Sequence, residues 1–181
     1  MSRPNSPYGV TKLACEHLAA AYARSFGLEA IGLRYFTVYG PRQRPDMAFA
    51  RIVDALARGG TFEVFGDGSQ SRSFTYVADV VEATIRALEG PPGSIYNIGG
   101  GEESSLRDSL DLLAAIAGRP LDIVYGPPSP GDMRRTCADT TRIERDLGWQ
   151  ATTLLEDGLR AHWEWAISTL TGREGGTGTA G

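Results

Sequence analysis

Apolar residues recur at steps of three and four positions along the first segment of the chain. This spacing predicts a helix with one apolar face, made of Val10, Ala14, Leu18 and Ala21. Pro7 is favoured at the first position of a helix, and Asn5 or Ser6 can cap the backbone there. Gly27 is typical of the position just after a helix ends. We therefore expect a helix from Pro7 to the residue before Gly27.

Short apolar runs between polar or glycine-rich stretches predict buried strands. Three such runs are residues 30–36, 94–99 and 121–126. Residues 61–77 predict two further strands around a polar turn centred on Gly66, Asp67 and Gly68. Proline and glycine punctuate two predicted loops, residues 38–46 and 127–139.

Helical spacing returns between these strands. It predicts helices at about residues 47–58, 79–89, 105–117, 141–148 and 154–170. The expected caps are Asp79, Ser104 or Ser105, and Thr140 or Thr141. In the helix that starts near Met47, we expect Ile52, Val53 and Leu56 to face inward. The alternation of strands and helices indicates an α/β fold. Residues 171–181 lack large apolar side chains, and we expect them to be disordered.

The composition is that of an ordinary soluble protein, with 41% hydrophobic and 22% charged residues among 181. The formal net charge of −4 argues against a nucleic-acid partner held by bulk electrostatics. The sequence contains no run of about 18 apolar residues, so it predicts no membrane span. The first residues lack the apolar segment of a secretory signal. Cys15 and Cys137 are too few for a disulfide framework or a zinc site. We therefore expect a cytoplasmic protein with two buried, reduced thiols and no bound metal.

Tyr8 and Lys12 are the first candidates for chemistry, and Lys12 is the only lysine in the chain. Residues four apart on a helix share a face, so the two side chains are expected to project together. A free phenol has a pKa of about 10 and is a poor base at neutral pH, but a nearby cation lowers that pKa. Such a pair can act as a general acid and base. The alternative is a chance surface pair, which seven tyrosines and one lysine in 181 residues give about 4% of the time.

Five segments, taken in order, carry a family resemblance. They are SPYGVTKLACEHL (6–18), GLRYFTVYGPRQRPDMAFARIV (32–53), VFGDGSQSRSFTYVADVVEATIRAL (64–88), NIGGGEESSL (97–106) and GDMRRTCADTTRIERDLGW (131–149). Together they resemble the extended short-chain dehydrogenase/reductases, the NAD-dependent nucleotide-sugar epimerases and dehydratases. The chain is most similar to the UDP-glucose and UDP-glucuronate 4-epimerases of that family.

The resemblance implies part of a Rossmann-type parallel sheet followed by a C-terminal α/β lobe that binds the nucleotide sugar. Members of the family begin with a G-x-x-G-x-x-G turn, where a helix N-terminus binds the dinucleotide pyrophosphate. No such turn occurs in this sequence. We therefore expect residues 1–170 to correspond to the C-terminal part of such an enzyme. The expected partner is a missing N-terminal half or a second copy of the chain, because absent strands would leave apolar edges exposed.

The resemblance also implies roles for individual residues. In this family a tyrosine takes the proton of the sugar 4-hydroxyl while hydride passes from C4 to NAD, which gives a 4-keto sugar. An epimerase returns the hydride to the other face of that sugar. Tyr8 matches the tyrosine, and Lys12 matches the lysine that hydrogen-bonds the nicotinamide ribose. Phe36 matches a position that lines the nicotinamide, with core packing as its alternative. NAD is thus the implied cofactor.

Further positions match residues that hold the nucleotide sugar, which the resemblance implies to be a UDP-sugar. Thr37 stands where many members carry an asparagine that touches the sugar or phosphate. Arg44 matches an arginine that pairs with the carboxylate of glucuronate-type sugars. The alternative for Arg44 is a loop charge or an ion pair with Asp46. Arg72 matches the arginine that binds the diphosphate. The positions expected to reach the uridine ribose and the diphosphate are Asp132 and Arg134.

The implied activity is an NAD-dependent nucleotide-sugar 4-epimerase of the UDP-glucose or UDP-glucuronate type. Thr37 and Arg44 favour this activity over a nucleotide-sugar 4,6-dehydratase, whose extra acid pair would lie outside this sequence. A nucleotide-sugar-binding lobe without catalysis is an alternative of a different class, and the absence of the cofactor-binding turn favours it. Separate binding measurements with UDP and with NAD distinguish these alternatives.

Overall fold

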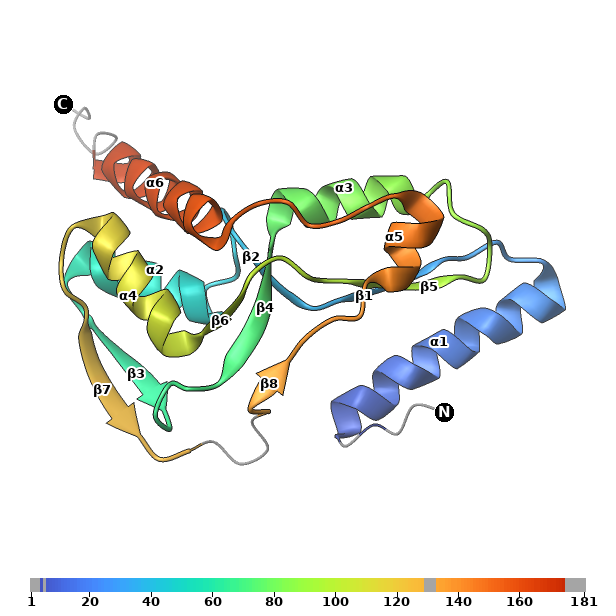
Figure 1. The fold of residues 1–181 in the computed structure, drawn as a ribbon, viewed down its shortest axis with the longest axis horizontal. Coiled ribbons are helices and arrows are strands. Elements are labelled where there is room, and N and C mark those ends of the chain that lie inside the picture. The colour runs from blue at the N-terminus through green and yellow to red at the C-terminus, as the bar shows by residue number, and fades with distance from the viewer. Residues whose placement is uncertain (1–3, 5, 129–132, 175–181) are drawn as a thin grey trace, which may run out of the picture.

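The computed structural model describes residues 4, 6–128 and 133–174 of the chain. Its helices and strands form two regions, which Figure 1 shows side by side. The packed lobe consists of residues 37–76, 101–126, 133–136 and 154–174. The open region consists of residues 7–36, 77–100 and 137–153. Helices and parallel strand pairs occur in both regions, which confirms the predicted α/β class.

Three helices pack together in the packed lobe. They are α2 (Ala48–Arg58), α4 (Leu106–Ala117) and α6 (Leu155–Glu174). Beside them, β3 (Thr61–Phe65) and β7 (Asp122–Gly126) pair in parallel. Helix α2 buries Ile52, Val53 and Leu56, as its spacing predicts. The spacing of apolar residues in α2 therefore agrees with the face that this helix buries.

A second group of strands completes the packed lobe. They are, in order of pairing, β2 (Thr37–Tyr39), β4 (Ser71–Tyr76) and β6 (Glu103–Ser105), with β8 (Arg135–Thr136) also paired to β4. The two strands predicted around the polar turn are present as β3 and β4. They do not pair with each other, because β3 pairs with β7 and β4 pairs with β2. The turn therefore connects two different sheets.

Tyr39 lies at the centre of the core of the packed lobe. Its ring packs edge-on against Phe49 and Phe74, and its hydroxyl donates a long hydrogen bond to the Leu155 carbonyl at 3.4 Å. Burial raises the pKa of the Tyr39 phenol, so the group stays a donor. A Cβ atom on Gly158 would overlap this hydroxyl, so the glycine lets α6 approach closely.

The open region is built on one parallel strand pair with helices on either side of it (Figure 1). The strands are β1 (Gly32–Tyr35) and β5 (Ile95–Ile98), and the helices are α1 (Pro7–Phe26), α3 (Val77–Ala87) and α5 (Thr141–Leu147). Tyr96, Ile98, Ile143 and Trp149 are fully or almost fully buried in a second, smaller core. Parallel sheets are normally covered on both faces. Here, most of the exposed large apolar side chains of the described residues lie in this region.

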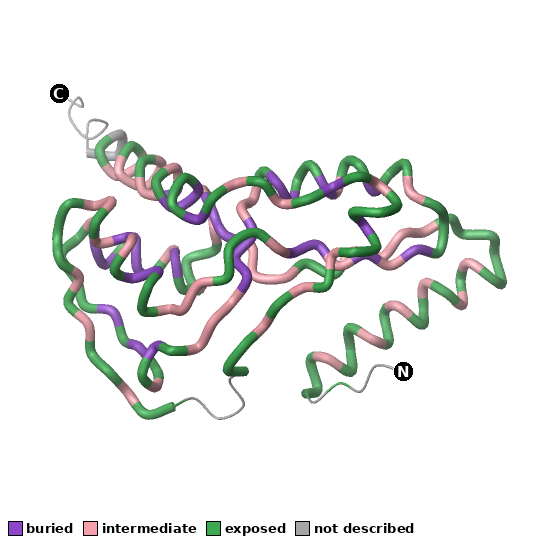
Figure 2. Tube along the Cα trace, viewed as in Figure 1, coloured by how far each residue is buried: buried purple, intermediate pink, exposed green. Residues whose placement is uncertain are grey.

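Helix α1 has the predicted bounds, but its predicted apolar face is not buried. Ser6 caps its start, and Gly27 ends it with φ 68°. None of its residues is buried, and Val10 and Leu18 of the expected apolar face are exposed. Figure 2 shows the contrast, with buried positions in the packed lobe and none along α1. Strand β1 is likewise only half-buried to exposed, although its composition predicts a buried strand.

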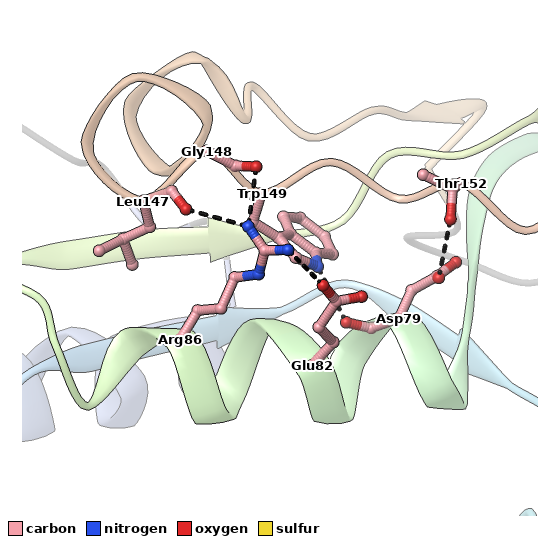
Figure 3. Close-up of polar contacts among 7 residues, drawn as sticks. All are labelled: Asp79, Glu82, Arg86, Leu147, Gly148, Trp149 and Thr152. Carbon is pink, nitrogen blue, oxygen red and sulfur yellow. Dashed lines mark hydrogen bonds and ion pairs between the residues drawn. The ribbon is translucent and has the colours of Figure 1, made fainter.

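Asp79 connects α3 to the segment that leads into α6 (Figure 3). The sequence predicts it as a helix cap, but the cap position is Tyr76 and Asp79 is buried in the first turn. Its carboxylate accepts the Thr153 backbone N–H at 3.1 Å, and its backbone carbonyl accepts the Trp149 indole N–H at 3.1 Å. Nearby, Arg86 donates to two carbonyl groups at the end of α5. Asp79 therefore fastens the segment that leads into α6 to the first turn of α3.

Other expectations need correction where burial or length depends on tertiary packing. Cys15 and Cys137 are free, as predicted, but both are exposed rather than buried. Helix α6 continues to Glu174, beyond the predicted end at residue 170, so the expected disordered tail starts too early. The rest of that tail, residues 175–181, lies outside the described residues.

Candidate functional site

Tyr8 and Lys12 lie together at the start of α1, as the sequence predicts. Ser6 Oγ accepts a hydrogen bond from the Gly9 backbone N–H at 3.1 Å, which fixes the start of the helix next to Tyr8. One turn later, Lys12 Nζ lies 5.2 Å from the centre of the Tyr8 ring, within range of a cation–π attraction. Tyr8 is 71% exposed. A ligand can therefore reach the pair.

The two side chains line one cleft of about 680 Å³ between α1 and β1. Glu16 of α1 and Arg34 of β1 line the same cleft and form an ion pair, with Arg34 Nε and Nη2 at 2.6 and 2.7 Å from the two carboxylate oxygens. The hydrogen bond from Arg34 lowers the pKa of Glu16, and the same bond raises the pKa of Arg34. Lys12 and the Glu16–Arg34 pair thus bring charged groups into a cleft whose walls are otherwise largely apolar, as is usual for a ligand site.

Phe36 separates β1 from β2, and Thr37 is the first residue of β2. The Phe36 N–H donates to the Ile98 carbonyl at 2.9 Å, and a Cβ atom on Gly99 would lie 3.2 Å from the Phe36 ring. The Phe36 side chain therefore lies close to the Gly99 backbone. Phe36 and Thr37 both follow the carboxyl end of β1, which is where parallel sheets commonly bind ligands. Among the described residues that line the Tyr8 cleft, neither Phe36 nor Thr37 is included.

Arg44 lies in the loop between β2 and α2. Its Nη2 atom is 3.0 Å from Asp46 Oδ2, so the ion pair considered as an alternative is present. The Arg44 side chain is 74% exposed, and exposed ion pairs are weak. The guanidinium can therefore exchange Asp46 for the carboxylate of a ligand.

Arg72 and Arg134 lie near each other at one end of β4. The Ser71 N–H donates to the Arg134 carbonyl at 2.9 Å, and Arg72 Nη1 donates to the Ser71 carbonyl at 2.8 Å. Arg134 also lines a hollow of about 580 Å³ between the turn after β3 and the end of β7. Asp132, the third predicted residue of this group, lies outside the described residues. Two of the three predicted nucleotide contacts thus lie close together, Arg72 on β4 and Arg134 just before β8.

Glu103 and Arg135 form a polar cluster that the sequence analysis does not predict. Glu103 accepts hydrogen bonds from Arg135 Nε and Nη2, both at 2.8 Å, and from Ser71 Oγ at 2.6 Å. The hydrogen bonds from Arg135 and then from Ser71 lower the pKa of Glu103 to about 2. The cluster joins β4, β6 and β8 beside Arg72. No local signal could have indicated it, because the pair is 32 residues apart in the sequence.

The described part of the chain lacks the features of two other classes of site. No group of three or more histidine, cysteine, aspartate or glutamate side chains that could hold a metal ion occurs there. Among the helices of residues 6–128 and 133–174, none has the length and apolar character needed to cross a membrane.

Curated relatives cover this chain with substantial identity. The "Uncharacterized UDP-glucose epimerase YtcB" of Bacillus subtilis strain 168 is 43% identical over 159 residues, which make up 86% of this chain and 50% of that protein. The UDP-glucuronate 4-epimerase of Thermodesulfobacterium geofontis is 34% identical over 92% of this chain and 52% of that protein. The chain therefore spans about half the length of the curated relatives it matches.

A solved structure and a family model agree with these relatives. The crystal structure of UDP-glucuronic acid 4-epimerase from Bacillus cereus, in complex with UDP-glucuronic acid and NAD, matches with a TM-score of 0.88 and 41% identity. The match covers 94% of this chain and 55% of that one. The model of the NAD dependent epimerase/dehydratase family matches residues 1–99, more than half of the 181 residues. The chain therefore belongs to the NAD-dependent epimerase/dehydratase family.

Proposed function

We propose that this chain acts in an NAD-dependent 4-epimerase of UDP-glucose or UDP-glucuronate. The observation that carries the proposal is the pair of Tyr8 and Lys12, which share one accessible cleft at the start of α1. Membership of the family supports the reaction class. Relatives named as UDP-glucose and UDP-glucuronate epimerases support the choice of substrate.

Tyr8 is the proposed acid and base. Its hydroxyl oxygen takes the proton of the sugar 4-hydroxyl as the 4-keto sugar forms, and it returns that proton when the other epimer is produced. The Lys12 ammonium, one helical turn away, stabilises the negative charge that develops on the phenol. Because neither group is buried, the pair needs a bound ligand to exclude water from it.

The Tyr8 cleft fits the nicotinamide-ribose end of NAD. The Lys12 ammonium offers N–H donors to ribose hydroxyls, and the cleft of about 680 Å³ has polar and apolar walls. NAD, when bound, supplies hydride transfer at C4 of the sugar. Phe36 is the proposed apolar neighbour of the nicotinamide, since it follows β1 at the carboxyl end of the sheet.

The nucleotide sugar is held mainly from the packed lobe. Arg72 and Arg134 are the proposed partners of the diphosphate, because guanidinium groups pair well with phosphate oxygens. Thr37 is the proposed contact of the sugar, and Arg44 is the proposed partner of the carboxylate of a uronic-acid sugar. The role of Asp132 at the uridine ribose remains a prediction from the sequence.

Product analysis tests the proposed reaction. The purified chain is incubated with NAD and either UDP-glucuronate or UDP-glucose, and NMR is used to detect the 4-epimer. We expect the 4-epimer to form, and we expect calorimetry to detect binding of both UDP and NAD. Binding of UDP without NAD, and without any product, would instead identify a nucleotide-sugar-binding lobe that lacks catalysis.

An arginine substitution tests the proposed nucleotide contacts separately. Arg72→Gln should weaken UDP binding by roughly tenfold or more, since a charge-assisted hydrogen bond contributes about 1.5–3 kcal/mol. Arg160→Gln is the matched control, because Arg160 forms an exposed ion pair on α6. Equal UDP affinities for the two variants would contradict the role of Arg72.

A further inference from the structure

The loop of residues 40–46, which carries Arg44, has a constrained backbone. Gly40 has φ 137°, and a side chain there would collide with Val77. Arg42 has φ 63°, in the left-handed region that non-glycine residues rarely adopt. Such a conformation persists only where the surrounding contacts hold it.

Gln43 supplies contacts to the elements on both sides of the loop. Its Nε2 atom donates to the Val38 carbonyl of β2 at 2.9 Å, and its Oε1 atom accepts the Ala50 N–H of α2 at 3.0 Å. Met47 occupies the cap position of α2, but its side chain makes no capping hydrogen bond. Gln43 therefore satisfies a free N–H of the first helical turn from outside the helix. It is half-buried, whereas the residues on either side of it are exposed.

Arg44 depends on the same loop for its orientation. The Arg44 carbonyl accepts the Met47 N–H at 3.0 Å, and the Gln43 N–H donates to the Gly40 carbonyl at 3.2 Å. The Arg44 guanidinium binds two residues that follow it closely in the sequence. Its Nη2 atom lies 3.0 Å from Asp46 Oδ2 and 3.7 Å from Met47 Sδ. The direction of the guanidinium is therefore set by the loop backbone, which the Gln43 side chain fastens to β2 and α2.

We propose that Gln43 is a positioning residue that orients Arg44 toward the carboxylate of a uronic-acid sugar. The inference rests on the proposed function, in which Arg44 pairs with that carboxylate. Bidentate pairing requires a defined guanidinium orientation. An arginine on a loose loop must be ordered when the ligand binds, which lowers affinity. Gln43 therefore controls discrimination between uronate and neutral sugars, and it leaves the nucleotide contacts unchanged.

Calorimetric titrations with UDP, UDP-glucose and UDP-glucuronate test this role. Gln43→Ala should reduce the preference for UDP-glucuronate over UDP-glucose roughly fivefold, the order expected for ordering one flexible side chain. Its affinity for UDP should stay within about twofold of the wild-type value. Asn97→Ala is the matched control, because Asn97 Nδ2 also donates to a backbone carbonyl, that of Asp139 at 2.9 Å. This control should leave the preference unchanged.

Two further measurements test whether Gln43 acts through Arg44. In an Arg44→Met background, Gln43→Ala should cause no additional change in the preference, because both substitutions affect one contact. Without ligand, hydrogen exchange at the Ala50 amide should become faster in Gln43→Ala, since its hydrogen-bond acceptor is lost. If Gln43→Ala does not fold, Gln43→Met keeps the bulk of the side chain and removes both hydrogen bonds.

The wild-type protein separates the two ways in which these experiments can fail. If it prefers UDP-glucuronate and Gln43→Ala keeps the full preference, the positioning role is overturned and the proposed function stands. If the wild-type protein binds UDP-glucose and UDP-glucuronate equally, the role of Arg44 in the proposed function is contradicted. The positioning role of Gln43 is then overturned together with it.

Discussion

Helices α1 and α6 each contain 20 residues, yet they have opposite relations to the rest of the chain. Helix α6 buries Leu155, Leu159 and His162 in the packed lobe, whereas no residue of α1 is buried. Leu159 is fully buried, and Leu18 of α1 is 59% exposed. Helix α1 is fastened to β1 by an ion pair that is partly exposed, and such pairs contribute little stability.

The difference indicates that stability and proposed chemistry are divided between the two regions. The packed lobe contains the larger core and the proposed nucleotide contacts Arg72 and Arg134. The open region carries Tyr8 and Lys12 on a helix that buries little surface. Elements with few buried contacts open locally at a low free-energy cost. Substitutions in the two regions should therefore change different properties.

The largest contrast is expected between matched leucines of the two helices. Leu159→Ala should lower the free energy of unfolding by about 2–5 kcal/mol, because it leaves a cavity in the core. Leu18→Ala should change it by less than about 0.5 kcal/mol, as is usual for an exposed position. Urea denaturation followed by circular dichroism measures both values. Equal losses would mean that α1 is packed in solution.

A pH effect is expected from His162 of α6. Burial lowers its pKa from 6.5 to about 4, and among the described residues its Nδ1 atom has no hydrogen-bond partner. Because the folded-state pKa is the lower one, the unfolded chain takes up the proton first as the pH falls. The contribution of neutral His162 to the free energy of unfolding is therefore fully present above about pH 6.5. Roughly 3 kcal/mol of the free energy of unfolding is lost as the pH drops to 4.

Thermal or urea unfolding between pH 7 and pH 4 measures this dependence. His162→Leu should remove this part of the slope, because the titrating group is gone. His17→Gln is the control, since His17 is exposed on α1, and it should keep the wild-type slope. A wild-type slope in His162→Leu would show that other groups cause the acid sensitivity.

A smaller effect is expected at Asp79, which fastens the segment that leads into α6 to α3. Asp79→Ala removes the acceptor of the Thr153 N–H and should lower the free energy of unfolding by about 1–3 kcal/mol. Glu82→Ala, on the same helix, removes an exposed pair with Arg86 and should cost less than about 1 kcal/mol. Urea denaturation compares the two variants, and similar losses would contradict a special role for Asp79.

The smallest change in stability is expected on the exposed side of α1, where association should change instead. We expect the chain to self-associate, because α1 exposes Leu18, Tyr22 and Phe26. Leu18→Ser with Phe26→Ser should reduce the particle size measured by light scattering, with little change in the midpoint of urea unfolding. A wild-type chain that is monomeric at all concentrations would contradict this expectation.

Local signals in the sequence predict most of the fold. The bounds of α1 follow from Ser6 and Gly27, and the end of α2 follows from Gly59. These residues act within one turn of the helix, so their effect does not depend on distant contacts. The spacing of Tyr8 and Lys12 predicts their common cleft for the same reason.

Features that depend on distant partners could not be predicted in this way. The apolar spacing of α1 does not reveal whether another element covers the helix, and in the structure its apolar face is not buried. The choice of partners for β3 and β4 depends on strands far away in the sequence. Asp79 is of a residue type favoured at helix N-caps, and only the fold brings the Thr153 N–H to its carboxylate. No sequence pattern indicates the role of Gln43 either, because its two hydrogen-bond partners lie on different elements.

Tyr8→Phe provides the most direct test of this division between the two regions. Turnover of UDP-glucuronate and affinity for UDP are measured on the same preparation, with Tyr22→Phe of α1 as the control. Tyr8→Phe should lose turnover by at least about 100-fold, the usual contribution of a general acid or base. Its UDP affinity should equal that of the wild-type protein and of Tyr22→Phe. A Tyr8→Phe protein that keeps its turnover, or that loses UDP affinity, would contradict the proposed division, in which Tyr8 serves the reaction and the packed lobe binds UDP.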